Sequence, residues 1–138
     1  MERTHIFKVE SDKSLSELVN EIKVKGTELG FIIKEDFDLG ELFKSHNINA
    51  DKNFKFHSIQ LCIPQKAYNS INENPERVSL IIPKNIIIYN NEEINKRIIT
   101  YLFIGSDFLK QILPEDKKIQ NSIPESSNKI IKLINSIK

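Results

Sequence analysis

The single cysteine, Cys62, is the residue best suited to covalent chemistry. It ends a predicted strand, two residues before Pro64 begins a predicted helix. Unpaired N–H groups and the dipole at a helix start stabilise a thiolate, and the charge of Lys66 would add to that effect. The alternative is a small buried side chain at a tight strand-to-helix turn, a common place for free cysteine. We favour the structural interpretation and keep a reactive thiol as the alternative.

Two tyrosines, Tyr68 and Tyr89, are placed to donate hydrogen bonds to a ligand in a cleft between helix and sheet. A half-buried tyrosine more often has a structural role, with its ring packed and its hydroxyl at the surface. We keep both tyrosines beside Cys62 and Lys66 as candidates for a ligand-binding site, and Cys62 as the candidate thiol of a catalytic site.

Several kinds of site are disfavoured. His57 and Cys62 are five residues apart on one predicted strand, so they should project from opposite faces and not form a nucleophile and base. His5 and His46 are isolated, and without a cluster of three ligands we expect no metal. The four glycines do not form a phosphate-binding loop. We therefore expect no cofactor and lean towards a protein that is not an enzyme.

Length and charge limit the classes of partner. A chain of 138 residues has the usual size of one domain, which we place at 1–138. Its net charge of +1 gives no overall attraction to nucleic acid or to an anionic membrane, so neither partner is expected. The start of the sequence lacks the apolar core of a signal peptide, and a lone cysteine fits a reducing compartment. These features predict a cytoplasmic protein.

The strand pattern predicts an α+β fold with a single antiparallel sheet. Alternating or continuous apolar residues mark six segments bounded by turn residues. The predicted strands lie near residues 5–9, 31–37, 54–62, 78–82, 85–90 and 97–104, with a break or bulge at Pro83.

Start and stop signals predict the helices. Ser14 opens a Ser-x-x-Glu capping box for a helix that ends near Leu29, before Gly30. Asp38 should cap a short helix; Asp36 and Asp38 share a strand face, but such a carboxylate pair is usually a solvated strand end. Pro64 begins a helix that stops at Asn74-Pro75.

Residues 106–138 should be helical with a break around Pro114, and they should dock on the rest of the domain. The apolar residues of the last helix lie within one stripe. These residues are Ile123, Ile130, Leu133, Ile134 and Ile137.

Three strands carry apolar residues without alternation, at 80–82, 86–88 and 102–104, and so place large side chains on both faces of the sheet. The predicted helices cover one face well. We expect a second copy of the chain to cover the other, through the strand around 86–89 or the terminal helix.

Three segments, 29–31, 62–68 and 82–89, resemble the domain of unknown function 302 family. They carry a glycine-phenylalanine entry to a strand, a Cys-x-Pro-x-x-Ala-Tyr helix start and a Pro-x-Asn-aliphatic strand that ends in tyrosine. The resemblance implies a TATA-binding-protein-like α+β fold, a curved antiparallel sheet with helices on one face, and a homodimer. Many members have a second cysteine where this chain has Lys84, so two-thiol chemistry within one subunit is not expected.

Two hypotheses for function follow. The first is a homodimeric binding or interaction module for an unknown small ligand or protein partner. The second is a thiol-dependent role, such as sulfur carriage or redox sensing, centred on Cys62. Access of solvent to the Cys62 sulfur distinguishes them, because a sealed sulfur favours the first hypothesis.

Overall fold

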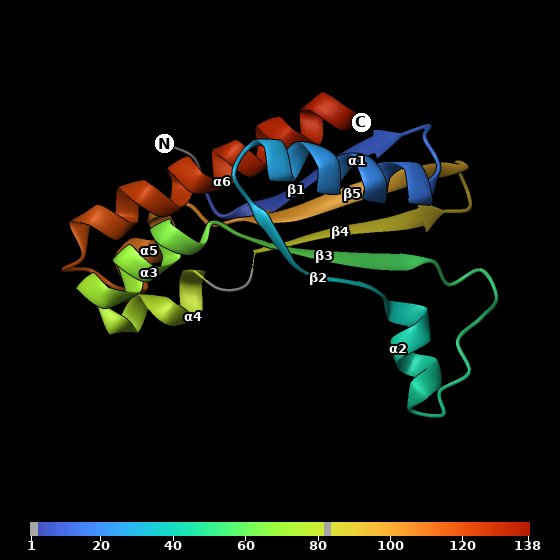
Figure 1. Ribbon diagram of the computed structural model, residues 1–138, viewed down its shortest axis with the longest axis horizontal. Helices are drawn as coiled ribbons and strands as arrows, with labels where there is room; N and C mark the ends of the chain where they lie inside the picture. The colour runs from blue at the N-terminus through green and yellow to red at the C-terminus, as the bar shows by residue number, and fades with distance from the viewer. Residues whose placement is uncertain (1–2, 82–83) are drawn as a thin grey trace.

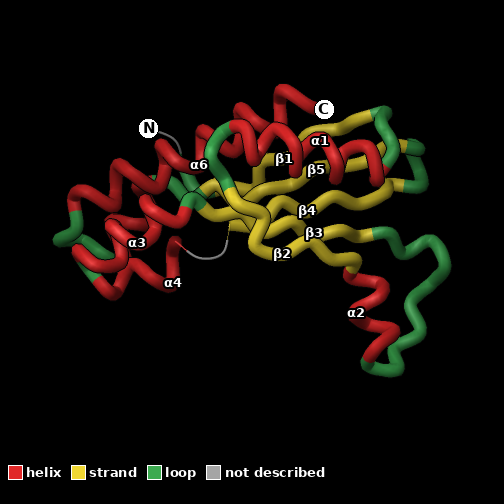
Figure 2. Tube along the Cα trace, viewed as in Figure 1, coloured by secondary structure: helices red, strands yellow, loops and turns green. Residues whose placement is uncertain are grey.

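The computed structural model describes residues 3–81 and 84–138 and shows a five-stranded antiparallel sheet (Figures 1 and 2). The strands follow the order β1-β5-β4-β3-β2, so only β1 joins the sheet out of chain order. The α+β class and the single antiparallel sheet are confirmed. The strand bounds are β1 His5–Ser11, β2 Ile32–Asp38, β3 Phe56–Cys62, β4 Lys84–Asn91 and β5 Lys96–Phe103.

The helices lie above one face of the sheet and at its two ends (Figure 1). The two longest, α1 and α6, run along the face, whereas α2 extends from one end and the shorter helices gather at the other. The helix bounds are α1 Leu15–Glu28, α2 Leu39–Ser45, α3 Pro64–Glu73, the 3₁₀ turn η1 Pro75–Arg77, α4 Val78–Ile81, α5 Ser106–Ile112 and α6 Lys117–Ile137.

Local signals in the sequence set several of these boundaries. The Ser14 hydroxyl accepts the N–H of Glu17 at 3.2 Å, and the Asp38 carboxylate accepts that of Glu41 at 3.1 Å, so both predicted N-caps are confirmed. Gly30 has a φ of +92° just after α1, a conformation that residues with a Cβ rarely adopt. The chain can therefore reverse from α1 directly into β2.

The main apolar core, here called the sheet core, lies between the sheet and the helices α1 and α6. The predicted stripe of α6 is confirmed, because its apolar residues are all buried. The sheet core comprises Leu18, Ile22, Phe31, Ile59, Leu61, Ile86, Ile88, Ile99, Tyr101, Ile130, Leu133, Ile134 and Ile137.

The opposite side of the sheet, here called the open face, carries exposed apolar side chains. Ile6 and Leu102 pair across β1 and β5 and are 62% and 49% exposed. Further along this face Tyr89 pairs with Phe56 on β3, and their rings stack 5.1 Å apart. The open face therefore carries exposed apolar side chains beside polar ones, such as Lys8 and Thr100, which pair between the same two strands.

A second apolar cluster, the helical-end core, lies where α3, α4, α5 and the start of α6 meet beside the sheet. It joins the end of β3 to these short helices. Its buried members are Cys62, Ala67, Ile81, Leu109, Ile119 and Ile123.

The prediction of a strand at 78–82 is wrong for its described part, because residues 75–81 form η1 and α4. Asn74, which we interpreted only as a helix stop, accepts the N–H of Glu76 and starts a new helical turn, with Pro75 in its first position. The end of that predicted strand at residue 82 and the predicted break at Pro83 lie outside the described residues.

Candidate functional site

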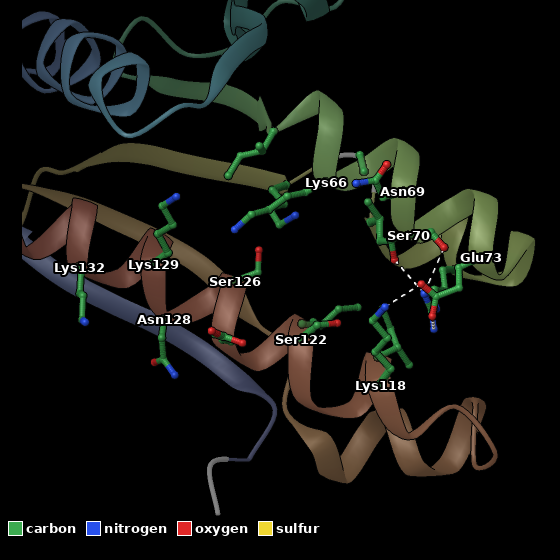
Figure 3. Close-up of a pocket in the computed structure, with 18 residues that line it drawn as sticks. Lys66, Asn69, Ser70, Glu73, Lys118, Ser122, Ser126, Asn128, Lys129 and Lys132 are labelled. Carbon is green, nitrogen blue, oxygen red and sulfur yellow. Dashed lines mark hydrogen bonds and ion pairs between the residues drawn. The ribbon is translucent and has the colours of Figure 1, made fainter.

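A cavity of about 580 Å³ lies at the helical end, between α3, α6 and the start of β4 (Figure 3). Six of its lining residues are lysine or arginine and two are glutamate. We call it the basic pocket. Its charged residues are Lys66, Glu73, Arg77, Lys84, Lys118, Glu125, Lys129 and Lys132.

One stripe of α6 forms a wall of the pocket. Lys118, Ser122, Ser126 and Lys129 recur at intervals of three or four residues, and so lie on one side of the helix. The neighbouring stripe holds the buried apolar residues that dock α6 on the two cores. Docking of the apolar stripe therefore fixes the direction in which the polar stripe faces.

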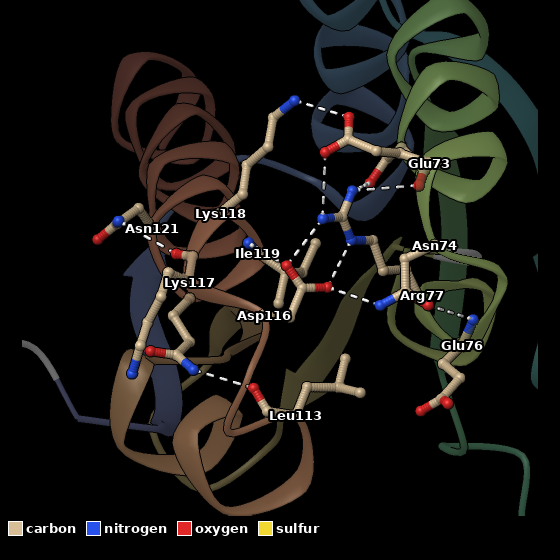
Figure 4. Close-up of polar contacts among 12 residues, drawn as sticks. Glu73, Asn74, Glu76, Arg77, Leu113, Asp116, Lys117, Lys118, Ile119 and Asn121 are labelled. Atoms are coloured by element: carbon tan, nitrogen blue, oxygen red, sulfur yellow. Dashed lines mark hydrogen bonds and ion pairs between the residues drawn. The ribbon is translucent and has the colours of Figure 1, made fainter.

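A buried ion pair joins the two walls of the pocket (Figure 4). Arg77 is only 4% exposed and donates two hydrogen bonds of 2.7 Å to the two carboxylate oxygens of Asp116. It also donates to the backbone carbonyl of Ser70 at 3.2 Å, which ties η1 to α3. A bidentate arginine–carboxylate contact fixes both partners in direction as well as distance.

Asp116 makes further hydrogen bonds beside its ion pair with Arg77. It accepts the amide of Asn74 at 2.9 Å and the N–H of Ile119 at 3.1 Å, and the latter contact caps α6. The hydrogen bonds from Arg77 hold the pKa of Asp116 well below its ordinary value, and the bonds to Asp116 raise the pKa of Arg77. Both groups therefore remain charged at neutral pH.

The cations of the basic pocket differ in how far they are neutralised. Lys118 donates to Glu73 at 2.7 Å, and this bond holds the pKa of Glu73 below its ordinary value. Among the described residues no carboxylate forms an ion pair with Lys66, Lys84 or Lys129. These three amines, together with that of Lys132, which also forms no ion pair in the described part of the chain, are the charges left for a ligand.

The side chains in Figure 3 show which of these groups face the cavity. Lys66 from α3 and Lys129 from α6 extend into the space between the two helices, and the Ser126 hydroxyl points the same way. Lys132 extends away from that space. The side chain of Lys129 also lies over the ring of Phe31, with its amine 5.3 Å from the ring centre.

Lys84 is half-buried, as is Lys129, whereas Lys66 is exposed. Lys84 is the first residue of β4 and lies opposite Leu61 of β3. Burial lowers the pKa of Lys84; the neighbouring Cys62 acts in the opposite sense, and the charge of Lys66 lowers the pKa further. Lys84 is therefore close enough to Cys62 and to Lys66 to interact with each of them.

The four candidates from the sequence do not form one site. Lys66 lines the pocket, whereas Cys62 is 9% exposed, belongs to the helical-end core and does not line it. Tyr68 is 64% exposed on the outer side of α3. Tyr89 lies on the open face and stacks on Phe56. Of the four candidates, Lys66 alone lines the cavity. Cys62 is connected with it only indirectly, through its interaction with Lys84.

The remaining groups with catalytic potential are engaged elsewhere. His57 bonds to Asp36, which also accepts Lys23 at 2.7 Å, so these side chains form a surface cluster away from Cys62. Within residues 3–81 and 84–138 there is no group of three histidine, cysteine or carboxylate side chains that could hold a metal. In the same two ranges no helix is long and apolar enough to span a bilayer.

Sequence reasoning missed Lys84, Arg77, Asp116 and Lys129 as site residues. One signal was available, because Lys118, Ser122, Ser126 and Lys129 form a polar stripe beside the apolar one. The pairing of Arg77 with Asp116, 39 residues away, had no local signal. The overall charge of +1 also hid a pocket in which cations outnumber carboxylates.

The fold and the pocket define a small α+β protein with helices on one face of an antiparallel sheet and a basic cavity at one end. The family described as "Domain of unknown function DUF302" matches residues 7–137, and the chain belongs to this family. A crystal structure of an uncharacterized conserved DUF302 protein from Bacillus stearothermophilus is similar in fold, with a TM-score of 0.69. The two chains are 14% identical over 96% of this chain and 94% of the other. No curated protein matches the chain.

Proposed function

We propose that the chain is a homodimeric binding module whose basic pocket takes a small anionic ligand. The observation that carries this proposal is the group of three amines, on Lys66, Lys84 and Lys129, that line one cavity without a carboxylate partner among the described residues. A cavity of about 580 Å³ lies within the size range of small-molecule sites. Unpaired cations that converge on a cavity favour a carboxylate or phosphate group.

The local charge supports an anion over a neutral ligand. The whole chain is nearly balanced, with 20 lysines and arginines against 19 acidic residues, so six cations around one cavity reflect placement and not composition. Lysine amines bind an oxyanion as point charges and do not need a glycine-rich loop. The hydroxyl of Ser126 can donate a hydrogen bond to the same oxyanion.

Titration calorimetry with inorganic phosphate and with lactate tests the ligand class. We expect binding that weakens as salt is added and that is lost in Lys66→Met and Lys129→Met. Lys117→Met is the matched control, because Lys117 is an exposed lysine of the same helix that does not line the cavity. Equal affinity in all three variants, or no binding by the native protein, would contradict an anion site.

The open face supports the homodimer. Ile6 and Leu102 are exposed large apolar side chains on a regular sheet surface, and Tyr89 and Phe56 extend that surface. The terminal helix is a poor interface, because its apolar stripe is already buried in the two cores. We therefore place the dimer contact on the open face, where a stable interface would bury about 1,200–2,000 Å² in total.

Sedimentation at micromolar concentration tests the dimer. The native chain should sediment as a dimer and Leu102→Glu as a folded monomer, because a charge at a symmetric interface is repeated in both copies. Val24→Glu is the control, since Val24 is equally exposed but lies on α1. A native chain that is a soluble monomer would contradict the dimer. Equal dissociation of Leu102→Glu and Val24→Glu would contradict a contact on the open face.

A thiol-dependent role in the reducing cytoplasm is the second candidate. Its support is the interaction of Lys84 with Cys62, because a nearby ammonium favours a thiolate. Its weakness is that Cys62 is 9% exposed, which by our own criterion favours the binding module. Iodoacetamide should alkylate the folded protein faster than it alkylates the unfolded chain at neutral pH if the thiol is functional. Alkylation only after unfolding would end this candidate.

A further inference from the structure

The position of Lys84 is more specific than anion binding requires. An amine that only attracts an anion can remain at the surface, as Lys66 does. Lys84 instead begins a central strand, is half-buried, lines the cavity and has no carboxylate partner among the described residues. A lysine held in a desolvated place beside a second cation is the arrangement by which proteins obtain a nucleophilic amine.

We propose that Lys84 captures an anionic carbonyl compound as an imine in the basic pocket. This inference rests on the proposed function, because Lys66 and Lys129 would hold the carboxylate or phosphate of the ligand. The carbonyl carbon would then lie within reach of the Lys84 amine. The ligand class is therefore an oxo acid or a phosphorylated aldehyde or ketone.

The surroundings of Lys84 suit this role. A nucleophilic amine must be uncharged, and both burial and the charge of Lys66 lower the pKa of Lys84. Cys62 acts in the opposite sense. The other charged residues that line the cavity are Glu73 of α3, Arg77 of η1, and Lys118, Glu125, Lys129 and Lys132 of α6. Because the anion binds to Lys66, its negative charge lies beside the amine that stays positive. The Lys84 amine is the one that must be neutral.

The reaction is a condensation and is balanced without an oxidant or reductant. The lone pair of the neutral Lys84 amine forms a bond to the carbonyl carbon, and the electron pair of the carbonyl π bond moves to oxygen. The oxygen then takes a proton from the nitrogen, which gives a neutral carbinolamine. The carbinolamine then loses its hydroxyl and one proton as water. The products are one imine on Lys84 and one water molecule.

Reductive trapping with pyruvate tests the inference on the full chain. Pyruvate carries both a carboxylate and a carbonyl, lactate carries the same charge without the carbonyl, and acetone has the carbonyl without the charge. Cyanoborohydride should convert the imine with pyruvate into a stable amine, seen by mass spectrometry as one pyruvic acid less one oxygen atom. We expect the peptide that contains Lys84 to carry this mass, with lactate as a competitor and with little product from acetone.

Four variants separate chemistry from folding. Lys84→Arg keeps the charge and Lys84→Met keeps the length, and both should lose the adduct while circular dichroism stays unchanged. If Lys84→Met fails to fold, Lys84→Arg still decides. Lys66→Met should reduce trapping and move its pH profile upward, whereas Lys117→Met, an exposed residue of α6 that does not line the cavity, should trap as the native chain does.

The outcomes distinguish this inference from the proposed function. Calorimetric binding of lactate without a trapped adduct overturns the imine and leaves the anion site intact. No binding and no adduct removes both. An adduct spread over exposed lysines, or one formed equally with acetone, also overturns the inference, because neither pattern needs the basic pocket.

Discussion

The sheet core and the helical end are stabilised in different ways. The sheet core is built from aliphatic and aromatic side chains, of which the polar tip of Tyr101 is the one polar group among its buried members. The helical end has a smaller apolar cluster, and its helices are also joined by the buried pair of Arg77 and Asp116. Apolar packing tolerates small rearrangement, whereas a bidentate ion pair fixes direction, so the second arrangement suits the walls of a pocket.

The largest effect that we predict is for Arg77→Met. This change leaves Asp116 charged and without its partner, and removing one member of a buried pair costs about 3–5 kcal/mol of unfolding free energy. The anion affinity of the basic pocket should fall as well, because η1 and α6 are no longer joined. Urea denaturation and calorimetry measure the two quantities.

Lys118→Met is the control for that change. The contact between Lys118 and Glu73 is at the surface, and exposed ion pairs contribute about 0–1 kcal/mol. If Lys118→Met lost as much anion affinity as Arg77→Met, the pocket would depend on its total charge and not on the buried pair of Arg77 and Asp116.

In the sheet core Ile88→Ala should have the next largest effect. Ile88 is fully buried in the central strand β4, and such truncations cost about 2–5 kcal/mol through lost contacts and the cavity left behind. In contrast to Arg77→Met, the folded fraction should bind phosphate with native affinity. Weaker phosphate binding by Ile88→Ala would show that the sheet core and the helical end are coupled, and would contradict the difference between them.

A smaller effect is expected at the turn between α1 and β2. Gly30→Ala places a Cβ on a residue with a φ of +92°, and the left-handed region costs other residues about 1–2 kcal/mol. Gly30→Asn should lose less, since asparagine adopts this region more readily. Thermal unfolding of the two variants checks the order, and equal stability of native and Gly30→Ala proteins would mean that the turn adjusts.

The smallest effect is a dependence on pH that belongs to the helical end. Because the folded pKa of Asp116 lies below its unfolded value of about 3.9, its stabilising effect is full above that value and is lost as pH falls below it. The difference in unfolding free energy between the native chain and Arg77→Met should be constant above about pH 5 and shrink in acid. If the difference in unfolding free energy instead grew as the pH fell, the pair of Arg77 and Asp116 would be excluded as its cause.

Most of the fold was predictable because the signals were local. Ser14 and Asp38 act as caps, Pro64 starts α3, and the stripe of α6 docks where its spacing predicts. The error at 78–82 came from reading Val-Ser-Leu-Ile-Ile as a buried strand, since a short apolar run fits a strand or a helix. Asn74 and Pro75 already carried the helix-start signal that decides between them.

The basic pocket was far less predictable than the fold. Lys66 was identified for its place at a helix start, but its role beside Lys84 and Lys129 depends on three elements that meet only in the folded chain. The same limit applies to Cys62, whose burial follows from packing against residues such as Ile119. Tyr68 and Tyr89 follow the sequence motifs, yet tertiary structure places them outside the cavity.

The strand order also determines when this fold can be completed during synthesis. β1 is synthesised before the other strands, but its neighbour is β5, so the pairing of His5 with Phe103 must wait until all the residues between them are made. The apolar side of the sheet is then covered by α1 alone, because α6 is made after β5. During that interval the nascent chain exposes both an apolar sheet surface and an unpaired strand edge. These two features recruit chaperones and promote aggregation. Slow synthesis between β5 and α6 should therefore lower the yield of folded protein more than slow synthesis anywhere earlier in the chain.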